Sequence, residues 1–581
     1  MNVYLYEKVM RNRSKLWLII LILVGIVGGV TGLFFVPKKK AEPVIADKSN
    51  GLEFSRESGF YDEEFDLAIS APSGMQVYYT LDGSEPSEAS IRYEGPIHLK
   101  DASENENVYS VREDVSTAFC YDLIEEYSYE KNSDYKLPDY KVDKCNVVRA
   151  VGIDADGKKT KIKTCSYFIG FDKKTGYDSV KVLSLVTDPT NLFDYNEGIY
   201  TTGAKFDEFT KRMKQGELDE GVTGSWQFWE ANYSKDNHLE KEFVAQFFEG
   251  DELVLSQKCG AKVHGGANRA QVQKSFNLYA RDDYGEDLFK YNLFDNSYYP
   301  KRVVLYMGST DEKRKILDWL TARLCKDLNI GTMNFEPYAV FLDGEYWGFY
   351  WLTERYDEEY LTYYYNVDPA NVIMIKNDEL KIGKEEDYNE FLDFQNHILE
   401  SDMTTEESYE WFVNQVDLDS FLDYYACLIY VCRQNDWPLY NVAIWKTKVS
   451  ENGKYNDGKW RYLLFDVNNT AYSEKLSPPG MDSFDFNMAV DDDFKQLMTN
   501  DKLRNQLLDR VLELEKTVYS TENVDRELKL FHSIMDEPMK NHCKRFWGED
   551  SYYRYEEGVQ EVDDFLHNHH EYVEQMVEKH R

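Results

Sequence analysis

The 581-residue chain has few of the features that mark common enzyme and metal-binding classes. Its 8 cysteines include no Cys-x-x-Cys spacing, which argues against a zinc site and a dense disulfide framework. No Gly-x-Ser-x-Gly, His-Glu-x-x-His or complete Walker motif is present. Basic residues are also scarce, with 67 Lys and Arg against 105 Asp and Glu and a net charge of -38. Such a chain would repel a phosphate backbone, so we expect no nucleic-acid partner.

The composition nevertheless predicts a folded protein with several domains. Hydrophobic residues make up 42% and aromatic residues 15% of the chain, which supplies ample apolar surface to bury. At roughly 150 residues per domain, the length corresponds to about three or four globular units. Helix-like and strand-like segments both occur, so we expect an α+β fold class.

One long hydrophobic run lies near the N-terminus. Residues 16–36 carry no charge, and as a helix they would span about 30 Å, which matches the hydrocarbon core of a bilayer. A cleaved signal peptide is the alternative, but the run is longer than a usual signal core and lacks a small-x-small cleavage site. We therefore predict a cytoplasmic tail at 1–15 and a transmembrane helix at 16–36.

The charges beside this run predict its orientation. Four basic side chains precede it and three follow it, and the amino terminus adds to the N-terminal excess. We expect a single-pass protein of the cell membrane, with the large C-terminal region outside the cytoplasm.

A β-rich region follows a polar linker at 37–59. From 60 to 170, the runs FDLAIS and MQVYYT alternate in hydrophobicity, and the dipeptide Asp156-Gly157 is typical of a hairpin turn. An acidic, Tyr-rich insertion interrupts the pattern at 101–144. The run YTLDGSEP followed by RAVGIDADG resembles the small β-sandwich module at the C-terminus of chitobiases and β-hexosaminidases. That resemblance implies either a spacer or a module that binds a glycan, for example of the cell wall.

Residues 178–581 contain a second series of ordered motifs. In chain order they are VLSLVTDPTNLFDYNEGIY, HGGANRAQVQKSFNL, VFLDGEYWGFYWLTE and NDWPLYNVAIWK with GKWRYLLFDVNN. This series resembles the spore-coat protein H (CotH) kinase-like family. The resemblance implies a two-lobed domain like that of an atypical protein kinase, placed after the β-sandwich module.

The last motif carries the candidate catalytic residues. Asp436 and Asn441 have the D-x-x-x-x-N spacing of a protein-kinase catalytic loop, and Asp466 ends the next predicted strand. The resemblance implies that Asp436 is the catalytic base and that Asn441 and Asp466 bind Mg²⁺ or Mn²⁺ beside ATP. By spacing alone an ordinary loop after a helix is the favoured interpretation, because Asp, Asn and Pro are common there and D-x-x-x-x-N occurs by chance in many chains.

One position departs from the family pattern. The family often has Asp-x-Asp where this chain has Asp466-Val467-Asn468. Asn468 offers a carbonyl oxygen to a hard cation but removes one negative charge. The expected consequence is weaker metal affinity or an inactive enzyme.

The second motif carries the candidate nucleotide-binding residues. Gly265 and Gly266 let backbone N–H groups approach a polyphosphate, and Arg269 adds donors. By resemblance, Lys274 is the phosphate-binding lysine, and Glu354 lies near the nucleotide. The alternative is that the glycines form a turn between strands, Lys274 is a solvated strand residue, and Glu354 makes a structural salt bridge.

Two functions are consistent with these patterns. The first is an atypical protein kinase, a transferase that passes the γ-phosphoryl group of ATP to Ser or Thr of a surface or coat protein. The second is a catalytically inactive, kinase-like adhesion or scaffold protein of the cell surface. The scarcity of ATP outside the cell favours the second.

Overall fold

The computed structural model describes residues 44–45, 51–130, 134–235, 239–296, 298–433, 440–449, 453–468 and 480–581. The predicted cytoplasmic tail and the predicted transmembrane helix at 16–36 lie outside these residues, as does Asp436. Within the described ranges, no helix combines the length and the apolar character needed to span a bilayer.

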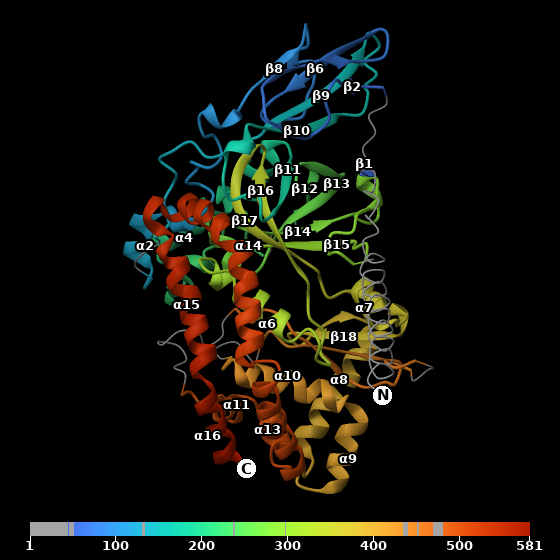
Figure 1. Cartoon of the computed structure of the whole chain (residues 1–581), viewed down its shortest axis with the longest axis vertical. Helices are drawn as coiled ribbons and strands as arrows, with labels where there is room; N and C mark the ends of the chain where they lie inside the picture. Colours follow the sequence, from blue (N-terminus) through green and yellow to red (C-terminus); the bar gives the residue numbers. More distant parts are fainter. Residues whose placement is uncertain are drawn as a thin grey trace, which may run out of the picture. The chain divides into compact units, whose positions relative to one another are not determined.

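A small β module occupies residues 51–170, drawn in blue to teal in Figure 1. Its main sheet has the order β3-β10-β9-β6-β7, and two further strand pairs, β2–β5 and β4–β8, accompany it. The bounds are β2 Glu53–Phe54, β3 Gly59–Tyr61, β4 Phe65–Leu67, β5 Ile69–Ser70, β6 Met75–Thr80, β7 Ile91–Arg92, β8 Ile97–Leu99, β9 Asn146–Asp154 and β10 Lys163–Ile169. The hairpin expected at Asp156-Gly157 is present, because β9 and β10 pair antiparallel around it. Leu52 and Phe54, inside the predicted linker, are buried in the core of this module.

The acidic insertion at 101–144 packs against the larger domain. It carries the helix α2 (Tyr121–Tyr127), and its buried Val115, Ile124 and Val142 belong to the same hydrophobic core as the large sheet. The insertion that interrupts the β pattern of one domain therefore contributes side chains to the core of another.

An eight-stranded sheet forms the centre of the larger domain. Its order is β1-β13-β12-β11-β16-β17-β15-β14, and β13 also pairs with β14. The bounds are β1 Val44–Ile45, β11 Lys181–Val186, β12 Lys241–Glu249, β13 Glu252–His264, β14 Ser275–Tyr279, β15 Arg302–Tyr306, β16 Phe335–Leu342 and β17 Glu345–Thr353. The predicted hairpin between β16 and β17 is confirmed, since Asp343 and Gly344 have φ of 44° and 91°, as a type I′ turn requires.

A smaller sheet and a group of helices complete the domain. The sheet order is β19-β18-β20-β21, with β18 Val372–Lys376, β19 Glu379–Ile382, β20 Ala443–Thr447 and β21 Arg461–Leu463. The helices are α3 Pro189–Phe193, α4 Gly203–Lys214, α5 Glu220–Thr223, α6 Leu317–Leu324, α7 Glu358–Tyr365, α8 Glu385–Glu400, α9 Glu406–Gln415, α10 Leu418–Tyr430, α11 Ser483–Val490, α12 Asp492–Leu497, α13 Asp501–Lys516, α14 Thr521–Trp547, α15 Tyr553–Asn568 and α16 His570–His580. The fold class is mixed α+β, as predicted.

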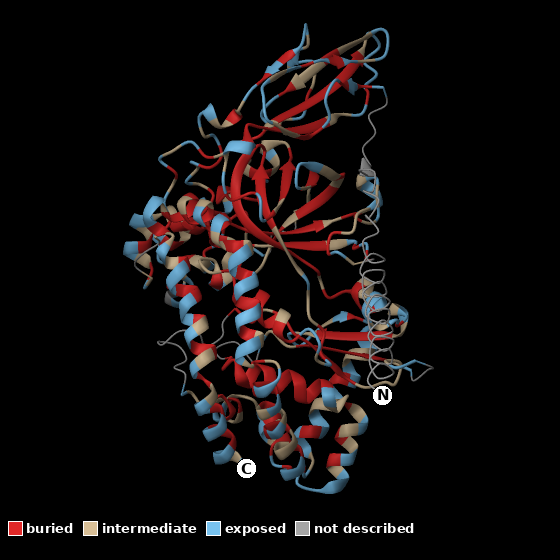
Figure 2. Ribbon diagram, in the orientation of Figure 1, coloured by how far each residue is buried: buried red, intermediate tan, exposed pale blue. Residues whose placement is uncertain are grey.

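The long helix α14 illustrates how the helices cover the central sheet. Phe531, Met535, Met539 and Phe546 follow one another at spacings of four, four and seven residues and are fully buried, which gives the helix one apolar face. Figure 2 shows this helix with alternating buried and exposed surfaces beside the buried strands. A hydrogen bond from the Phe349 amide to His542 joins it to β17.

Candidate functional site

The centre of the candidate site is the turn after β21, residues 466–468, which we call the acidic turn. Asp466 is half-buried and has φ of 54°, an unfavourable backbone conformation for a residue with a side chain. The guanidinium of Arg433 donates to the carbonyl oxygens of Phe465 and Asp466 at 3.3 and 2.5 Å. These bonds hold the backbone in the conformation that places the Asp466 carboxylate at the edge of the smaller sheet.

Asn468 joins this turn to the large sheet and to α6. Its amide nitrogen donates to the Tyr306 hydroxyl at 2.8 Å and to Asp318 at 3.1 Å, and it also contacts the Asp466 carboxylate. Its side-chain oxygen accepts from Thr310 at 2.6 Å. The four groups that surround Asn468 therefore come from three separate segments of the chain.

Asp318 is a member of this cluster that the sequence analysis missed. One of its oxygens accepts from the Val467 amide at 2.6 Å, and the other accepts from the Tyr306 hydroxyl at 2.6 Å. Burial, reinforced by the negative charge of Asp466, raises the pKa of Asp318 to about 6. The sequence feature that could have identified Asp318 is its position as an acidic residue within the largely apolar stretch of α6, because an unpaired carboxylate is costly to bury.

Two cations lie near the acidic turn. Burial lowers the pKa of Lys376, at the end of β18, to about 8; Asp466 opposes this shift and Arg355 adds to it. The Lys376 ammonium lies 3.7 Å from the centroid of the Phe465 ring, and Arg355 donates to Asn277 at 2.8 Å. Sequence patterns gave no reason to single out either cation, because Lys376 ends an ordinary strand and Arg355 follows one.

The donor set of the cluster fits a hard divalent cation. The Asn468 amide has two N–H hydrogens but faces three oxygen atoms, from Asp466, Asp318 and Tyr306. Carboxylate oxygens are ligands that Mg²⁺ and Mn²⁺ prefer, whereas Asn468 presents its nitrogen to Asp466 and its oxygen to Thr310. The two cations near the turn, Lys376 and Arg355, suit the phosphate groups of a nucleotide.

The other residues of the predicted catalytic loop are only partly described. Asp436 lies outside the described residues. Asn441 has φ of 59°, and its backbone amide donates to the Asn377 side chain at 2.8 Å. The roles of Asp436 and Asn441 remain predictions.

The predicted glycine loop closes upon itself. Gly265 has φ of 109°, while Gly266 is exposed. Arg269 donates from Nε to the Gly265 carbonyl at 2.6 Å and from its guanidinium to the Tyr233 carbonyl at 3.3 Å. These bonds join the loop to its own backbone at Gly265 and to the backbone at Tyr233.

Lys274 is fully buried beneath this loop. Its amine donates to the carbonyl oxygens of Arg269 and Gln271 at 2.6 and 2.7 Å and lies 3.8 Å from the centroid of the Tyr233 ring. Burial, followed by the charge of Arg269, lowers the pKa of Lys274 well below its ordinary value. The structure corrects the alternative expectation that Lys274 is solvated.

The strand register separates Lys274 from the acidic turn. Phe276 packs on Tyr200 with ring centroids 5.7 Å apart, and the Lys274 amine lies 5.0 Å from the same Tyr200 ring. Side chains alternate between the faces of a sheet, so Asn277 points to the opposite face, as does Tyr306 on the neighbouring strand. The structure thus does not bring Lys274 together with Asp466, and a phosphate-binding role for Lys274 stays a prediction that requires the loop to open.

Comparison with protein families gives two matches. Residues 261–573, more than half of the chain, match the model of the CotH kinase protein family. The chain belongs to the CotH kinase family. Residues 67–167 match the Fn3-associated family, which supports a separate module there but does not confirm its likeness to the chitobiase module. No curated protein matches the chain.

The CotH match includes the glycine loop, Lys274 and the acidic turn, but it begins only at the end of β13. The strands β11 and β12 precede it in sequence and are nevertheless hydrogen-bonded in the same sheet. The folded CotH unit of this chain is therefore larger than the matched segment.

Glu354 is held inside the CotH domain by hydrogen bonds from neutral groups. It is fully buried, and its carboxylate accepts from the Tyr364 hydroxyl at 2.6 Å and from the Asn334 amide at 2.8 Å. Burial raises the pKa of Glu354 to about 7. Because these partners are neutral groups, the expectation that Glu354 makes a structural salt bridge is not confirmed.

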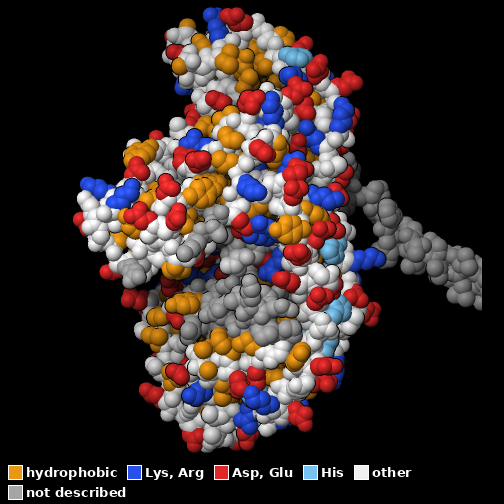
Figure 3. Space-filling view, turned by 90° about the vertical axis from the view of Figure 1, so that its left-hand side faces the viewer, with side chains coloured by type: hydrophobic (Ala, Val, Ile, Leu, Met, Phe, Trp, Pro, Cys, Tyr) orange, Lys and Arg blue, Asp and Glu red, His pale blue; other side chains and the backbone are white. Residues whose placement is uncertain are grey.

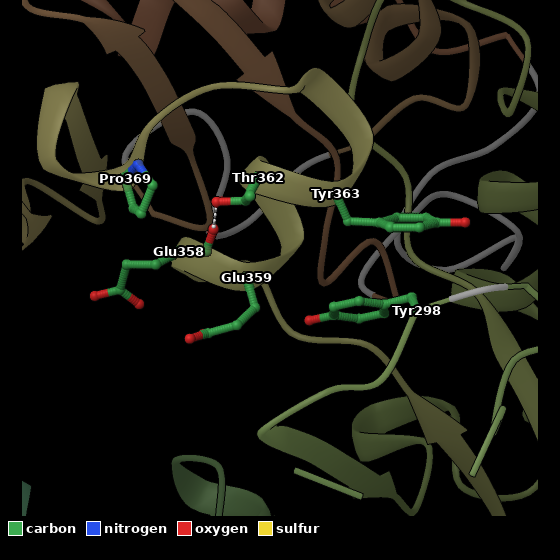
Figure 4. A pocket seen from close by; sticks show the side chains of 6 residues that line it. All are labelled: Tyr298, Glu358, Glu359, Thr362, Tyr363 and Pro369. Carbon is green, nitrogen blue, oxygen red and sulfur yellow. Dashed lines mark hydrogen bonds between the residues drawn. The ribbon is translucent and has the colours of Figure 1, made fainter. Parts of the chain in front are cut away.

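A surface depression of about 550 Å³ lies elsewhere on the CotH domain. Figure 4 shows its lining residues, which are Tyr298, Glu358, Glu359, Thr362, Tyr363 and Pro369. The rings of Tyr298 and Tyr363 are stacked with centroids 5.2 Å apart, and Glu359 pairs with Lys301 at 2.7 Å. None of the predicted site residues lines this depression.

Proposed function

We propose that this CotH-family chain is a membrane-anchored atypical protein kinase that transfers the γ-phosphoryl group of ATP to Ser or Thr of a protein, such as a surface or coat protein. The observation that supports the proposal most directly is the acidic turn itself. It combines an accessible Asp466, held in an unfavourable backbone conformation, with polar oxygen atoms of α6 and β15 and with two cations nearby. Strained residues of this kind concentrate at functional sites.

Each group has a role that follows from its chemistry. Asp466 would hold Mg²⁺ or Mn²⁺, which neutralises the charge that develops on the transferred phosphoryl group. The Asn468 oxygen, which accepts from Thr310 in this structure, would join it as a ligand only after the amide turns over. Lys376 and Arg355 would donate hydrogen bonds to phosphate oxygens. Asp436 would orient the acceptor hydroxyl and take its proton.

A kinase-like adhesion or scaffold protein without catalytic activity is the second candidate. The enclosed amine of Lys274 and the neutral Asn468 favour it, because both reduce the charge available to a nucleotide and its cation. On the face in Figure 3, acidic and basic side chains are interspersed, as on an ordinary solvated surface. The absence of a nucleic-acid partner and the binding of a cell-wall glycan by the small module both remain proposals.

Phosphoryl transfer by the full-length chain in detergent distinguishes the two functions. The chain is incubated with γ-labelled ATP, Mg²⁺ or Mn²⁺ and a Ser-rich acidic protein. We expect label in the wild type, none in Asp466→Ala, a strong reduction in Lys376→Met and little change in the control Lys301→Met. Label that persists in Asp466→Ala would refute the assigned site. No label, combined with no thermal shift by ATP and metal, would favour the scaffold.

The membrane topology needs its own test. We infer a single crossing by residues 16–36 because this run is long and uncharged. Protease added to intact cells or spheroplasts should then digest the region after residue 36. Protection of that region until the membrane is broken would refute an extracytoplasmic location.

A further inference from the structure

The acidic turn is held from one side by α6. Asp318 accepts a hydrogen bond from the Val467 backbone amide at 2.6 Å, which fixes the peptide between the two side chains that would hold the cation. It also accepts from the Asn468 amide at 3.1 Å and from the Tyr306 hydroxyl at 2.6 Å. Every polar contact named here has the Asp318 carboxylate as acceptor, so both of its oxygen atoms are in use in the wild-type chain.

The identity of residue 468 is coupled to this carboxylate. The Asn468 amide nitrogen faces Asp318 and Asp466, while its oxygen faces the Thr310 hydroxyl at 2.6 Å. A carboxylate at 468 would direct a third negative charge at two existing ones, and like charges this close strongly disfavour joint ionisation. The amide is therefore the group that allows two carboxylates to approach each other here.

We infer that Asp318 is a positioning residue of the cation site: it fixes the backbone of the acidic turn and supplies, from α6, the second negative charge that Asn468 does not. This inference rests on the proposed function, because it assumes that Asp466 holds a divalent cation. It assigns Asp318 to no step of the reaction. It places the charge of the site on two segments, α6 and the acidic turn, whose mutual position sets the metal affinity.

A reciprocal exchange tests the inference. In the double variant Asp318→Asn/Asn468→Asp, the new amide at 318 still accepts from the Val467 amide with its oxygen and donates to the new carboxylate at 468. The total charge is kept, the Tyr306 hydroxyl would donate to residue 468 in place of residue 318, and the hydrogen bond from residue 468 to Asp466 is lost. The single variant Asp318→Asn keeps the shape but removes one charge.

Mn²⁺ binding to the full-length chain, measured by electron paramagnetic resonance of the free ion, is the readout. We expect Asp318→Asn to weaken Mn²⁺ binding about 10- to 100-fold, the usual effect of losing a carboxylate beside a metal ligand. The double variant should recover most of the wild-type affinity. Where both proteins also transfer phosphate, the metal concentration for half-maximal rate should shift in parallel.

Asp311→Asn is the matched control. Asp311 is also buried, and its carboxylate accepts from the backbone amides of Ile316 and Leu317 at 2.7 and 2.8 Å at the start of the same helix. This variant should lower the melting temperature while leaving Mn²⁺ affinity within about twofold of wild type, a change below 0.5 kcal/mol.

The outcomes separate this inference from the function on which it rests. Wild-type affinity in Asp318→Asn, or a double variant no better than the single one, overturns the role of Asp318 and leaves the proposed kinase intact. Absence of Mn²⁺ binding in the wild type, with and without ATP, overturns the cation site and this inference with it.

Discussion

Replacing Glu345 with alanine should detach part of the acidic insertion from the CotH domain. Glu345 is the first residue of β17 and is almost fully buried. Its carboxylate accepts from three backbone amides of the insertion, those of Val108, Tyr109 and Ser110, at 2.5, 3.2 and 2.8 Å. One side chain therefore holds a segment more than two hundred positions away in sequence.

The expected cost follows from these three bonds. A hydrogen bond to a charged acceptor contributes roughly 1.5–3 kcal/mol to stability. A buried amide that loses its partner also pays the free-energy cost of having been removed from water. The sum overstates the effect, because the released segment can take up water. We expect Glu345→Ala to lower the free energy of unfolding by about 3 kcal/mol.

Hydrogen exchange of the full-length chain is the decisive measurement. Peptides that cover residues 106–112 should lose protection in Glu345→Ala, and strands far from the insertion should not. Glu345→Gln, which keeps the shape and one acceptor oxygen, should give an intermediate loss. Unchanged exchange in these peptides, with an unfolding midpoint that moves by less than the equivalent of about 1 kcal/mol, would refute the reasoning.

Two further predictions concern residues of the candidate site. The pKa of Glu354 is raised from 4.5 to about 7, so between these two pH values the folded chain keeps a proton that the unfolded chain releases. The stability that protonated Glu354 contributes is fully present below pH 4.5 and is lost as the pH rises through 7. In the wild type this loss lowers the free energy of unfolding by about 3 kcal/mol, and in Glu354→Gln it should be missing from the pH dependence of urea unfolding. An unchanged pH dependence would contradict the raised pKa of Glu354. Gly265→Ala should destabilise the chain by about 2 kcal/mol, because φ is 109° and the new Cβ would lie 1.9 Å from Asn268. The control Gly95→Ala meets no atom within 4 Å and should melt like the wild type; equal melting of both variants would show that the loop adjusts freely.

Local sequence was sufficient for the features that depend on neighbouring residues. The Asp343-Gly344 dipeptide predicted a hairpin because few residues adopt two successive positive φ angles, and the structure has that turn. The ordered motifs predicted the CotH family, and the family match confirms it. The pattern WRYLLFD predicted a strand that ends near Asp466, and β21 with the acidic turn follows that order.

The sequence was not sufficient where a side chain's role depends on which face of the sheet it occupies. Lys274 matched a family motif, yet its amine lies under its own loop, on the face opposite Tyr306 and the acidic turn. The motif gives the residue type and the strand. The direction of the side chain depends on the register between β14 and its neighbours, and a single-residue shift in register would reverse it.

What the sequence by itself determined is therefore the α+β class, the family, the hairpin and the presence of an acidic turn at the end of a strand. Tertiary structure alone decided that Asp318 joins that turn, that Lys376 and Arg355 lie near it, and that the acidic insertion is held by Glu345. Asp318 and Val467 are 149 positions apart, and no local pattern encodes their contact. The physical reason is that periodicity and backbone preference act within a few residues, whereas the pairing of distant polar groups follows from how buried surfaces pack.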